Sequence, residues 1–269
     1  MRNRISITLK KDIIEQVDRL VDGMQIRSRS QAIEYLLAKT LTDIKLKTAL
    51  VLAGGEKEDF KGRNRFMMPI KGKPILSYVI EHLASFNVNK ILVYVDCFKE
   101  EVMNYFKNGN DFHVSIEYLT SDKSKGNIQP LLMARKKIND TFIVFYGDTI
   151  SSIDLADMLA FHRQNQNIAT VALTTVSNPK DYGIAVLKGN KVMDFKEKPE
   201  EDMQSFLVSS GIFIFEPRIF NYIGSGMKSI EKDLLPYLVK KQLLTGYTFQ
   251  GKWLNINTKK DFKKALLMV

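Results

Sequence analysis

The sequence predicts an α/β fold in which a mostly parallel sheet is flanked by helices, with a small separate module in front of it. The first observation is an apolar run at residues 50–53 that ends on Gly54 and Gly55, which is typical of a buried first strand. The second is the alternation of strand and helix patterns after this run. The third is a polar stretch at residues 42–47, which we interpret as a junction between two domains.

Length and composition are those of a globular protein with one large or two unequal domains. The chain has 269 residues, of which 45% are apolar and 26% are charged. No apolar run approaches the roughly 20 residues that cross a bilayer, and no signal-peptide pattern is present, so we expect no membrane partner. The single cysteine, Cys97, excludes an internal disulfide framework and favours a cytoplasmic location. The three histidines lack the spacing of zinc ligands.

The net charge of +10 favours acidic partners such as nucleic acid or nucleotide phosphates. Residues 1–47 carry ten Lys or Arg and six Asp or Glu, whereas the rest of the chain carries 30 and 24. The N-terminal part is therefore the more basic part per residue. We expect the domain boundary to separate residues 1–45 from residues 46–269.

The N-terminal module contains one strand pattern and two helix patterns. Residues 4–9 alternate with period two, and their polar face carries Arg4, Ser6 and Thr8. Residues 12–22 show helical spacing, and a second helix begins with a capping box at Ser28. One strand and two short helices cannot bury a core alone. We therefore expect two chains to pair their strands, which makes the protein a homodimer or a higher homo-oligomer.

A paired two-stranded ribbon fits the major groove of DNA, where Arg4, Ser6 and Thr8 would face base edges. Backbone N–H groups near Arg29 and Ser30, at the start of the second helix, offer a phosphate contact. Residues 2–41 resemble the ribbon-helix-helix family of DNA-binding domains, in the strand Arg-Ile-Ser-Ile-Thr-Leu and the helix start Ser-Arg-Ser-Gln-Ala-Ile-Glu. The alternative is a dimerisation arm without affinity for DNA.

The remaining chain alternates between the two kinds of element. Helices are expected at residues 74–83, 99–106, 131–138 and 155–163, and strands at 90–95, 114–119, 142–146, 168–176, 183–187, 192–195 and 211–215. Asp148 follows the strand at 142–146, at the edge where open α/β sheets bind ligands, so it is a candidate to hold a Mg²⁺ ion beside a nucleotide phosphate. The alternative for Asp148 is a helix cap, for which Asp154 is better placed.

The loop after Gly54 and Gly55 is basic. The glycines allow a tight turn and a close approach of a ligand to backbone N–H groups. Lys61, Arg63 and Arg65 then supply the positive charge that a polyphosphate requires. This combination predicts a nucleotide site at the end of the first strand.

Short sequence blocks across residues 48–269 resemble the sugar-phosphate nucleotidyltransferases, which couple a sugar 1-phosphate to a nucleoside triphosphate and release pyrophosphate. The blocks are Leu52-Ala53-Gly54-Gly55, Pro69-Ile70-Lys71-Gly72-Lys73-Pro74-Ile75-Leu76, Gly147-Asp148, Tyr182-Gly183, Glu197-Lys198-Pro199, Gly211 and Trp253-Leu254-Asn255-Ile256. The resemblance implies a Rossmann-like fold and Mg²⁺ as cofactor. It assigns to the nucleotide Ala53, Gly54, Gly55, Gly126 and Gln129, and to the sugar phosphate Gly183, Glu197, Lys198 and Gly211.

The sequence departs from the family pattern at the implied catalytic positions, for which Arg65, Lys198 and Asp148 are the candidates. The family's Gly-Thr-Arg is missing, and Arg65 stands in place of the lysine of Pro-Lys-Pro, with the same charge but a planar fork. The family's Trp-x-Asp-x-Gly supplies a second metal ligand, and Asn255 stands in place of this aspartate. An amide oxygen carries no charge, so we expect weaker Mg²⁺ binding.

Two functions follow from these observations. The first is a DNA-binding regulator whose second domain binds a nucleotide, a sugar phosphate or a nucleotide sugar, with impaired catalysis. The second is an active nucleotidyltransferase whose first domain serves dimerisation or regulation. Intact Gly147-Asp148 and Glu197-Lys198 pairs motivate the second hypothesis.

Overall fold

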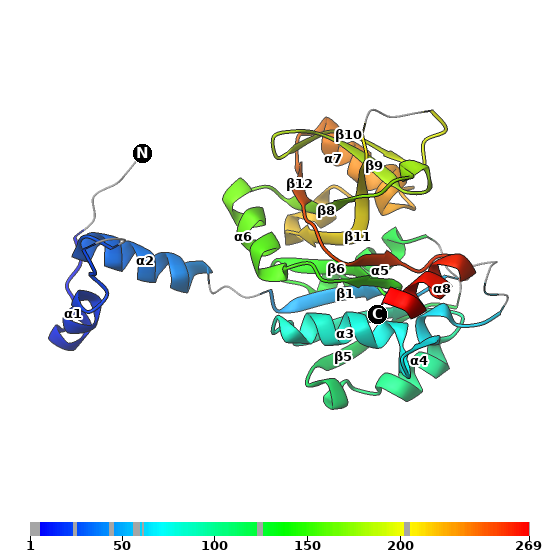
Figure 1. Cartoon of the computed structure of the whole chain (residues 1–269), viewed down its shortest axis with the longest axis horizontal. Coiled ribbons are helices and arrows are strands. Elements are labelled where there is room, and N and C mark those ends of the chain that lie inside the picture. Colours follow the sequence, from blue (N-terminus) through cyan, green and yellow to red (C-terminus); the bar gives the residue numbers. More distant parts are fainter. Residues whose placement is uncertain are drawn as a thin grey trace. The chain divides into compact units, whose positions relative to one another are not determined.

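The chain divides into two compact units, Met1–Lys45 and Leu46–Val269, which we call the N-terminal and C-terminal units (Figure 1). The computed structural model describes residues 6–23, 26–42, 46–55, 60, 62–122, 126–201 and 205–268, with only the backbone described at 38–42. In this part of the chain, every helix is too short or too polar to cross a bilayer.

The N-terminal unit consists of α1 (Lys11–Asp18) and α2 (Arg29–Thr42), and α1 ends earlier than the predicted 12–22. The predicted capping box is present in modified form, because Ser28 Oγ accepts a hydrogen bond from the Gln31 N–H (3.3 Å) while Gln31 Oε1 accepts from the Arg27 N–H (2.7 Å). Residues 6–10 have no regular secondary structure in the single chain.

The apolar surface of this unit is only partly covered. Val17 and Ala32 are buried, whereas four large apolar side chains are at least 42% exposed: Ile7, Ile13, Tyr35 and Leu37. Such an arrangement is expected for one half of a paired ribbon, since the segment before α1 and the apolar helix faces need a second chain to cover them. Arg4 lies outside the described residues.

In the described part of the C-terminal unit, the largest sheet has the order β5-β4-β1-β6-β11-β8-β12-β10-β9. Its strands are β1 (Thr48–Leu52), β4 (Lys90–Val95), β5 (Ser115–Thr120), β6 (Phe142–Tyr146), β8 (Ala169–Thr175), β9 (Gly183–Lys188), β10 (Lys191–Glu197), β11 (Leu207–Phe215) and β12 (Leu244–Thr248). The pairs β5–β4, β4–β1, β1–β6 and β8–β12 are parallel. The other neighbouring pairs are antiparallel.

The α/β class is therefore confirmed, but the parallel strands are concentrated in the first half of the sheet. Helices flank this half and extend beyond it: α3 (Ile75–Ser85), α4 (Lys99–Phe106), α5 (Ile128–Ala134), α6 (Leu155–Asn165), α7 (Leu235–Lys240) and α8 (Lys259–Met268). Two small antiparallel pairs complete the unit, β2 (Pro69–Ile70) with β3 (Lys73–Pro74), and β7 (Thr149–Ser151) with β13 (Trp253–Asn255).

Most predicted elements of this unit are present with shifts of a few residues. The helix predicted at 74–83 begins after Pro74, which is its N-cap. Asp154 caps α6, accepting hydrogen bonds from the N–H groups of Ala156 (2.9 Å) and Asp157 (3.0 Å). The assignment of this cap to Asp154 rather than to Asp148 is confirmed. The strands β2, β3, β7, β12 and β13 and the helices α7 and α8 were not predicted.

The fold brings the ends of β1 and β6 together. These two strands are parallel neighbours, and β4 lies on the other side of β1, so the order of the chain reverses between β1 and β6. Ligands bind at such a reversal, beyond the carboxyl ends of the strands. Gly147 follows β6 and ties the two strand ends together, because its N–H donates to Leu52 O (2.9 Å). A Cβ on Gly147 would lie 3.1 Å from Ala53 Cβ, so a residue without a side chain fits best here.

Candidate functional site

A cavity of about 340 Å³ opens at the carboxyl ends of β1 and β6. Nine of the residues that the sequence singled out line it, and they come from distant parts of the chain: Gly54, Gly55, Arg65, Asp148, Gly183, Glu197, Lys198, Gly211 and Asn255. Described lining residues to which the sequence analysis assigned no ligand role are Leu52, Asn127, Tyr146, Asp181, Tyr182, Ser209, Ser229, Glu231, Lys232 and Asn257.

A buried ion pair lies at the base of the cavity. Arg65, at the start of a short 3-10 helix (Arg65–Met67), donates from Nε to Asp148 Oδ2 at 2.8 Å. The two side chains are only 8% and 7% exposed. Arg65 Cζ also lies 4.1 Å from the centre of the Phe66 ring, which packs against the guanidinium. Arg65 was expected to face a triphosphate, and in the structure it compensates Asp148.

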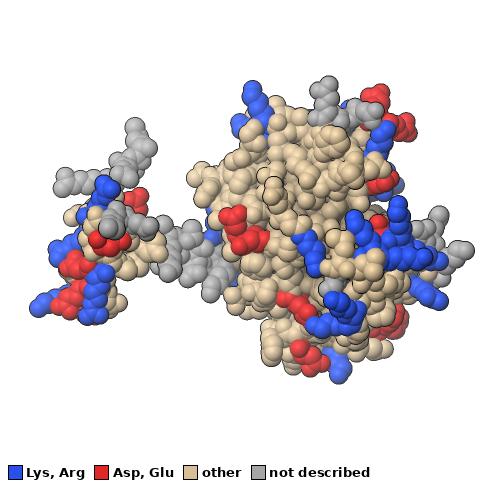
Figure 2. Space-filling model, viewed as in Figure 1, with Lys and Arg blue, Asp and Glu red and all other residues tan. Residues whose placement is uncertain are grey.

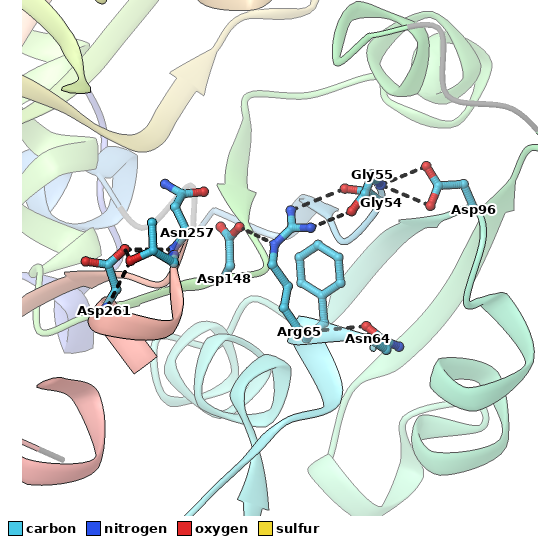
Figure 3. A network of polar contacts seen from close by, with 10 residues as sticks. Gly54, Gly55, Asn64, Arg65, Asp96, Asp148, Asn257 and Asp261 are labelled. Atoms are coloured by element: carbon cyan, nitrogen blue, oxygen red, sulfur yellow. Dashed lines mark hydrogen bonds and ion pairs between the residues drawn. The ribbon is translucent and has the colours of Figure 1, made fainter. Parts of the chain in front are cut away.

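The glycine turn is tied to the same guanidinium on one side and to a carboxylate on the other (Figure 3). Arg65 Nη1 donates to Gly55 O, and Nη2 lies 3.5 Å from Gly54 O. The Gly55 N–H donates to both carboxylate oxygens of Asp96, at 3.0 and 2.8 Å. Asp96 is buried at the end of β4 and was not predicted as a site residue. A Cβ on Gly54 would lie 2.5 Å from the Tyr94 ring, so only glycine fits at this position.

The opposite wall is formed by β9, β10 and β11. A Cβ on Gly183 would lie 2.7 Å from Glu197 Oε2, and a Cβ on Gly211 would lie 2.8 Å from the Tyr146 ring. Lys198 has a backbone φ of +46°, a left-handed conformation that is costly for a lysine, and its N–H donates to Tyr182 O (3.0 Å). Strained backbone of this kind is concentrated at ligand sites.

A hydrogen-bond network that sequence reasoning missed connects three parts of the chain at the cavity. Asn127 Nδ2 donates to Tyr146 Oη (2.6 Å) and to Glu231 Oε2 (2.8 Å), and its Oδ1 accepts from the Ile230 N–H (2.7 Å). Tyr146 Oη donates to Glu231, which lies on a π-helix (Ile230–Leu234). Burial, and then the negative charge of Glu231, raise the pKa of Tyr146 well above its usual value, so this hydroxyl stays protonated.

Several predicted site residues lie away from the cavity lining. Ala53 is buried, and Arg63 is exposed. Gln129 donates to Ser121 Oγ (3.1 Å). Gly126 has a φ of +88° and packs against the backbone of Lys228. Lys61 lies outside the described residues.

Of the predicted DNA-contact residues, Arg29 and Ser30 lie at the start of α2, and Ser6 and Thr8 lie before α1. Arg29 makes a two-point ion pair with Asp18, from Nε (2.5 Å) and from Nη2 (2.7 Å), so its guanidinium joins α1 to α2. Ser30 lies in the first turn of α2 and is exposed. Ser6 and Thr8 are exposed in the segment before α1.

Basic side chains also gather beside the cavity. Figure 2 shows Lys and Arg side chains on the face of the C-terminal unit where α8 lies. The exposed lysines of this helix are Lys259, Lys260, Lys263 and Lys264. Lys260 and Lys264 line a second cavity, of about 440 Å³, which shares Tyr182 and Asn255 with the first. A positive rim raises the local concentration of anionic ligands.

Comparison with known proteins agrees with this geometry. The sequence model of the nucleotidyl transferase family matches residues 48–268. The chain belongs to the nucleotidyl transferase family. A second model, for ribbon-helix-helix proteins of the copG family, matches residues 3–43. Both resemblances stated from the sequence are thereby confirmed, and the ribbon-helix-helix match indicates a DNA-binding module in front of the nucleotidyl transferase unit.

Individual relatives have the same fold. The chain is 31% identical to a UTP–glucose-1-phosphate uridylyltransferase of Synechocystis over 74% of its length and to a bifunctional GlmU protein of Methanocaldococcus jannaschii over 81%. It covers only 56% and 53% of these proteins, so it spans little more than half the length of the curated relatives it matches. The crystal structure of HddC from Yersinia pseudotuberculosis superposes with a TM-score of 0.72 at 20% identity, covering 82% of this chain and 99% of that one.

The resemblance implies a divalent cation for the C-terminal unit, and the donor set of the described residues does not fit one. Asp148 is already compensated by Arg65, and the second expected ligand, Asn255, is neutral. Among the described residues, no group of three or more His, Cys, Asp or Glu side chains is arranged to hold a metal ion. Mg²⁺ is held in proteins by carboxylates and phosphates that lie close together, and the described carboxylates of this cavity do not form such a group.

Proposed function

We propose that this protein is a dimeric, DNA-binding transcriptional regulator whose nucleotidyl transferase unit binds a nucleotide or a nucleotide sugar and has little catalytic activity. The observation that carries the proposal is the buried pair of Arg65 and Asp148. Nucleotidyl transfer relies on charge neutralisation and on precise orientation of the triphosphate. In this cavity the acidic group that would hold a metal ion already holds a side chain of the protein.

The rest of the cavity lining is suited to binding a sugar and a phosphate. The glycines Gly183 and Gly211 leave room close to the backbone, and Glu197 supplies oxygens that accept hydrogen bonds from sugar hydroxyls. Lys198 supplies a positive charge for a phosphate. Ligand binding alters DNA affinity only if the ligand binds one conformation of the whole chain more tightly than another. The proposal therefore requires two such conformations.

The first prediction concerns this coupling. DNA duplexes bound by the full-length protein would be selected from a random pool and titrated by fluorescence anisotropy with and without GDP-mannose, UDP-glucose or dTDP-glucose. One of these nucleotide sugars is expected to change the dissociation constant for DNA by about 5-fold or more, the usual range of coupling between two sites.

A matched pair of variants locates the effect. Lys198→Met removes a charge from the cavity and should reduce the response to the nucleotide sugar, whereas Lys188→Met removes an exposed lysine at the end of β9 and should leave it intact. An unchanged DNA affinity with every ligand, despite measurable ligand binding, would refute the coupling.

The second candidate function is active sugar-1-phosphate nucleotidyl transfer. It is favoured by the convergence of Asp148, Glu197 and Lys198 on one cavity. The discriminating measurement is pyrophosphate release from each nucleoside triphosphate with a panel of sugar 1-phosphates and Mg²⁺. Turnover at ordinary enzyme rates, on the order of 1–1,000 per second, would establish the second function and exclude the sensor without catalysis.

A further inference from the structure

Arg65 occupies the position of a cation within the cavity. Its guanidinium is fixed by Asp148, by the carbonyl groups of Gly54 and Gly55 and by the Phe66 ring. These hydrogen bonds use three of the five N–H groups of the guanidinium. Arg65 lines the cavity, and hydrogen bonds to the described residues leave two of its N–H groups unused, so we infer that these groups donate to a bound anion.

In the described part of the glycine turn, residues 53–55, two backbone N–H groups are already paired within the protein. Such a cradle needs backbone N–H groups directed at the anion. Here the Gly55 N–H is used by the buried Asp96 carboxylate, and the Ala53 N–H donates to Tyr94 O (2.9 Å). A triphosphate at this turn would therefore meet the Asp96 carboxylate and would lack these two hydrogen bonds.

The charges in the cavity favour a ligand with fewer negative groups. Apart from the Arg65–Asp148 pair, the described cationic residues of the lining are Lys198 and Lys232. A nucleoside diphosphate sugar carries a single charge on each of its two phosphates and a triphosphate carries more, so the triphosphate needs more cationic partners than these two ammonium groups. Three further carboxylates of the lining disfavour additional negative charge: Asp181, Glu197 and Glu231.

Asn255 places a hydrogen-bond acceptor without a partner at the cavity. Its Oδ1 is buried at the cavity without a hydrogen-bond partner in the structure. A buried acceptor without a partner is costly, and a hydroxyl donor on a ligand removes this cost. The neutral amide is therefore better suited to a sugar hydroxyl than to a metal ion that needs charged ligands.

From these four observations we propose that the cavity binds a nucleoside diphosphate sugar without a divalent cation, with the Arg65 guanidinium as a built-in replacement for the metal ion. This inference rests on the proposed function, since it names the ligand class of the same cavity. It differs from that function in one measurable respect, the independence of binding from Mg²⁺.

The test is isothermal titration calorimetry of the full-length protein with GDP-mannose, UDP-glucose and dTDP-glucose, each in EDTA and in excess Mg²⁺. The affinity for the best ligand should agree within about twofold between the two conditions, and the matching nucleoside triphosphate should bind at least about tenfold more weakly in EDTA. A rise of tenfold or more on adding Mg²⁺ would overturn this inference and leave the proposed function standing. Absence of nucleotide-sugar binding in both conditions would overturn this inference, and absence of triphosphate binding as well would overturn the proposed function.

Two charge variants provide a readout that does not depend on the wild-type affinity. Asn255→Asp adds a carboxylate beside Asp148, and it should weaken nucleotide-sugar binding in EDTA and create a dependence on Mg²⁺. Asn257→Asp adds the same charge to the same cavity and is the matched control, for which no Mg²⁺ dependence is expected. The bound Mn²⁺ signal in electron paramagnetic resonance should appear only with Asn255→Asp, and its presence in the wild-type protein would overturn the inference.

Discussion

An Arg65→Ala variant is expected to lose about 3–5 kcal/mol of unfolding free energy, because removal of one partner leaves the buried Asp148 carboxylate without compensation. The loss also releases the carbonyl groups of Gly54 and Gly55, so nucleotide-sugar binding should fall below detection. Urea unfolding followed by circular dichroism measures the first effect and calorimetry measures the second.

The origin of this loss is tested by a second substitution. Combining Arg65→Ala with Asp148→Asn removes the uncompensated charge, so the double variant should be more stable than Arg65→Ala alone. Arg63→Ala, which removes an exposed neighbour, should change stability by no more than about 0.5 kcal/mol. Equal stability of Arg65→Ala and the double variant would show that the ion pair does not carry the effect.

Gly126→Ala is expected to cause the second large loss of unfolding free energy. Gly126 has a φ of +88°, and a Cβ there would lie 2.1 Å from the backbone oxygen of Lys228. The left-handed conformation costs roughly 1–2 kcal/mol for alanine, and the backbone clash adds about 1–3 kcal/mol. Because Asn127 follows directly, the hydrogen bonds to Tyr146 and Glu231 should weaken as well.

Gly189→Ala is the matched control for this substitution. Gly189 also has a positive φ of +58°, but a Cβ there would meet no atom within 4 Å. Only the conformational cost of roughly 1–2 kcal/mol is expected. The comparison is made from urea midpoints, and a similar loss in both variants would mean that the backbone at Lys228 moves away to accommodate the methyl group.

The fold could be predicted largely because the strands of the first half are continuous apolar runs that end on glycine. Residues 90–95 and 142–146 were predicted with the bounds of β4 and β6. The second half was less predictable, since β7 and β13 are only three residues long and exist through their pairing with each other. Such short strands carry no periodic signal of their own.

The positions of the site residues were predictable from motif spacing, but their interactions were not. Glu197, Lys198 and Asn255 line one cavity with Asp148, as the resemblance implied. Arg65 was interpreted as a cation for the ligand, because a sequence does not show that its planar fork reaches a carboxylate 83 positions away. Glu231 was missed for a related reason: its role arises from contacts with Asn127 and Tyr146, which are remote in sequence.

The packing of Trp253 has a practical consequence. It is the single tryptophan of the chain, its ring centre lies 5.3 Å from that of Tyr182, and its indole N–H donates to Ser210 O at 3.0 Å. Tyr182 lines the cavity, so a molecule that enters there changes the polarity around one indole only. The emission of this protein therefore provides an intrinsic optical signal of occupancy, free of labels and of contributions from other tryptophans.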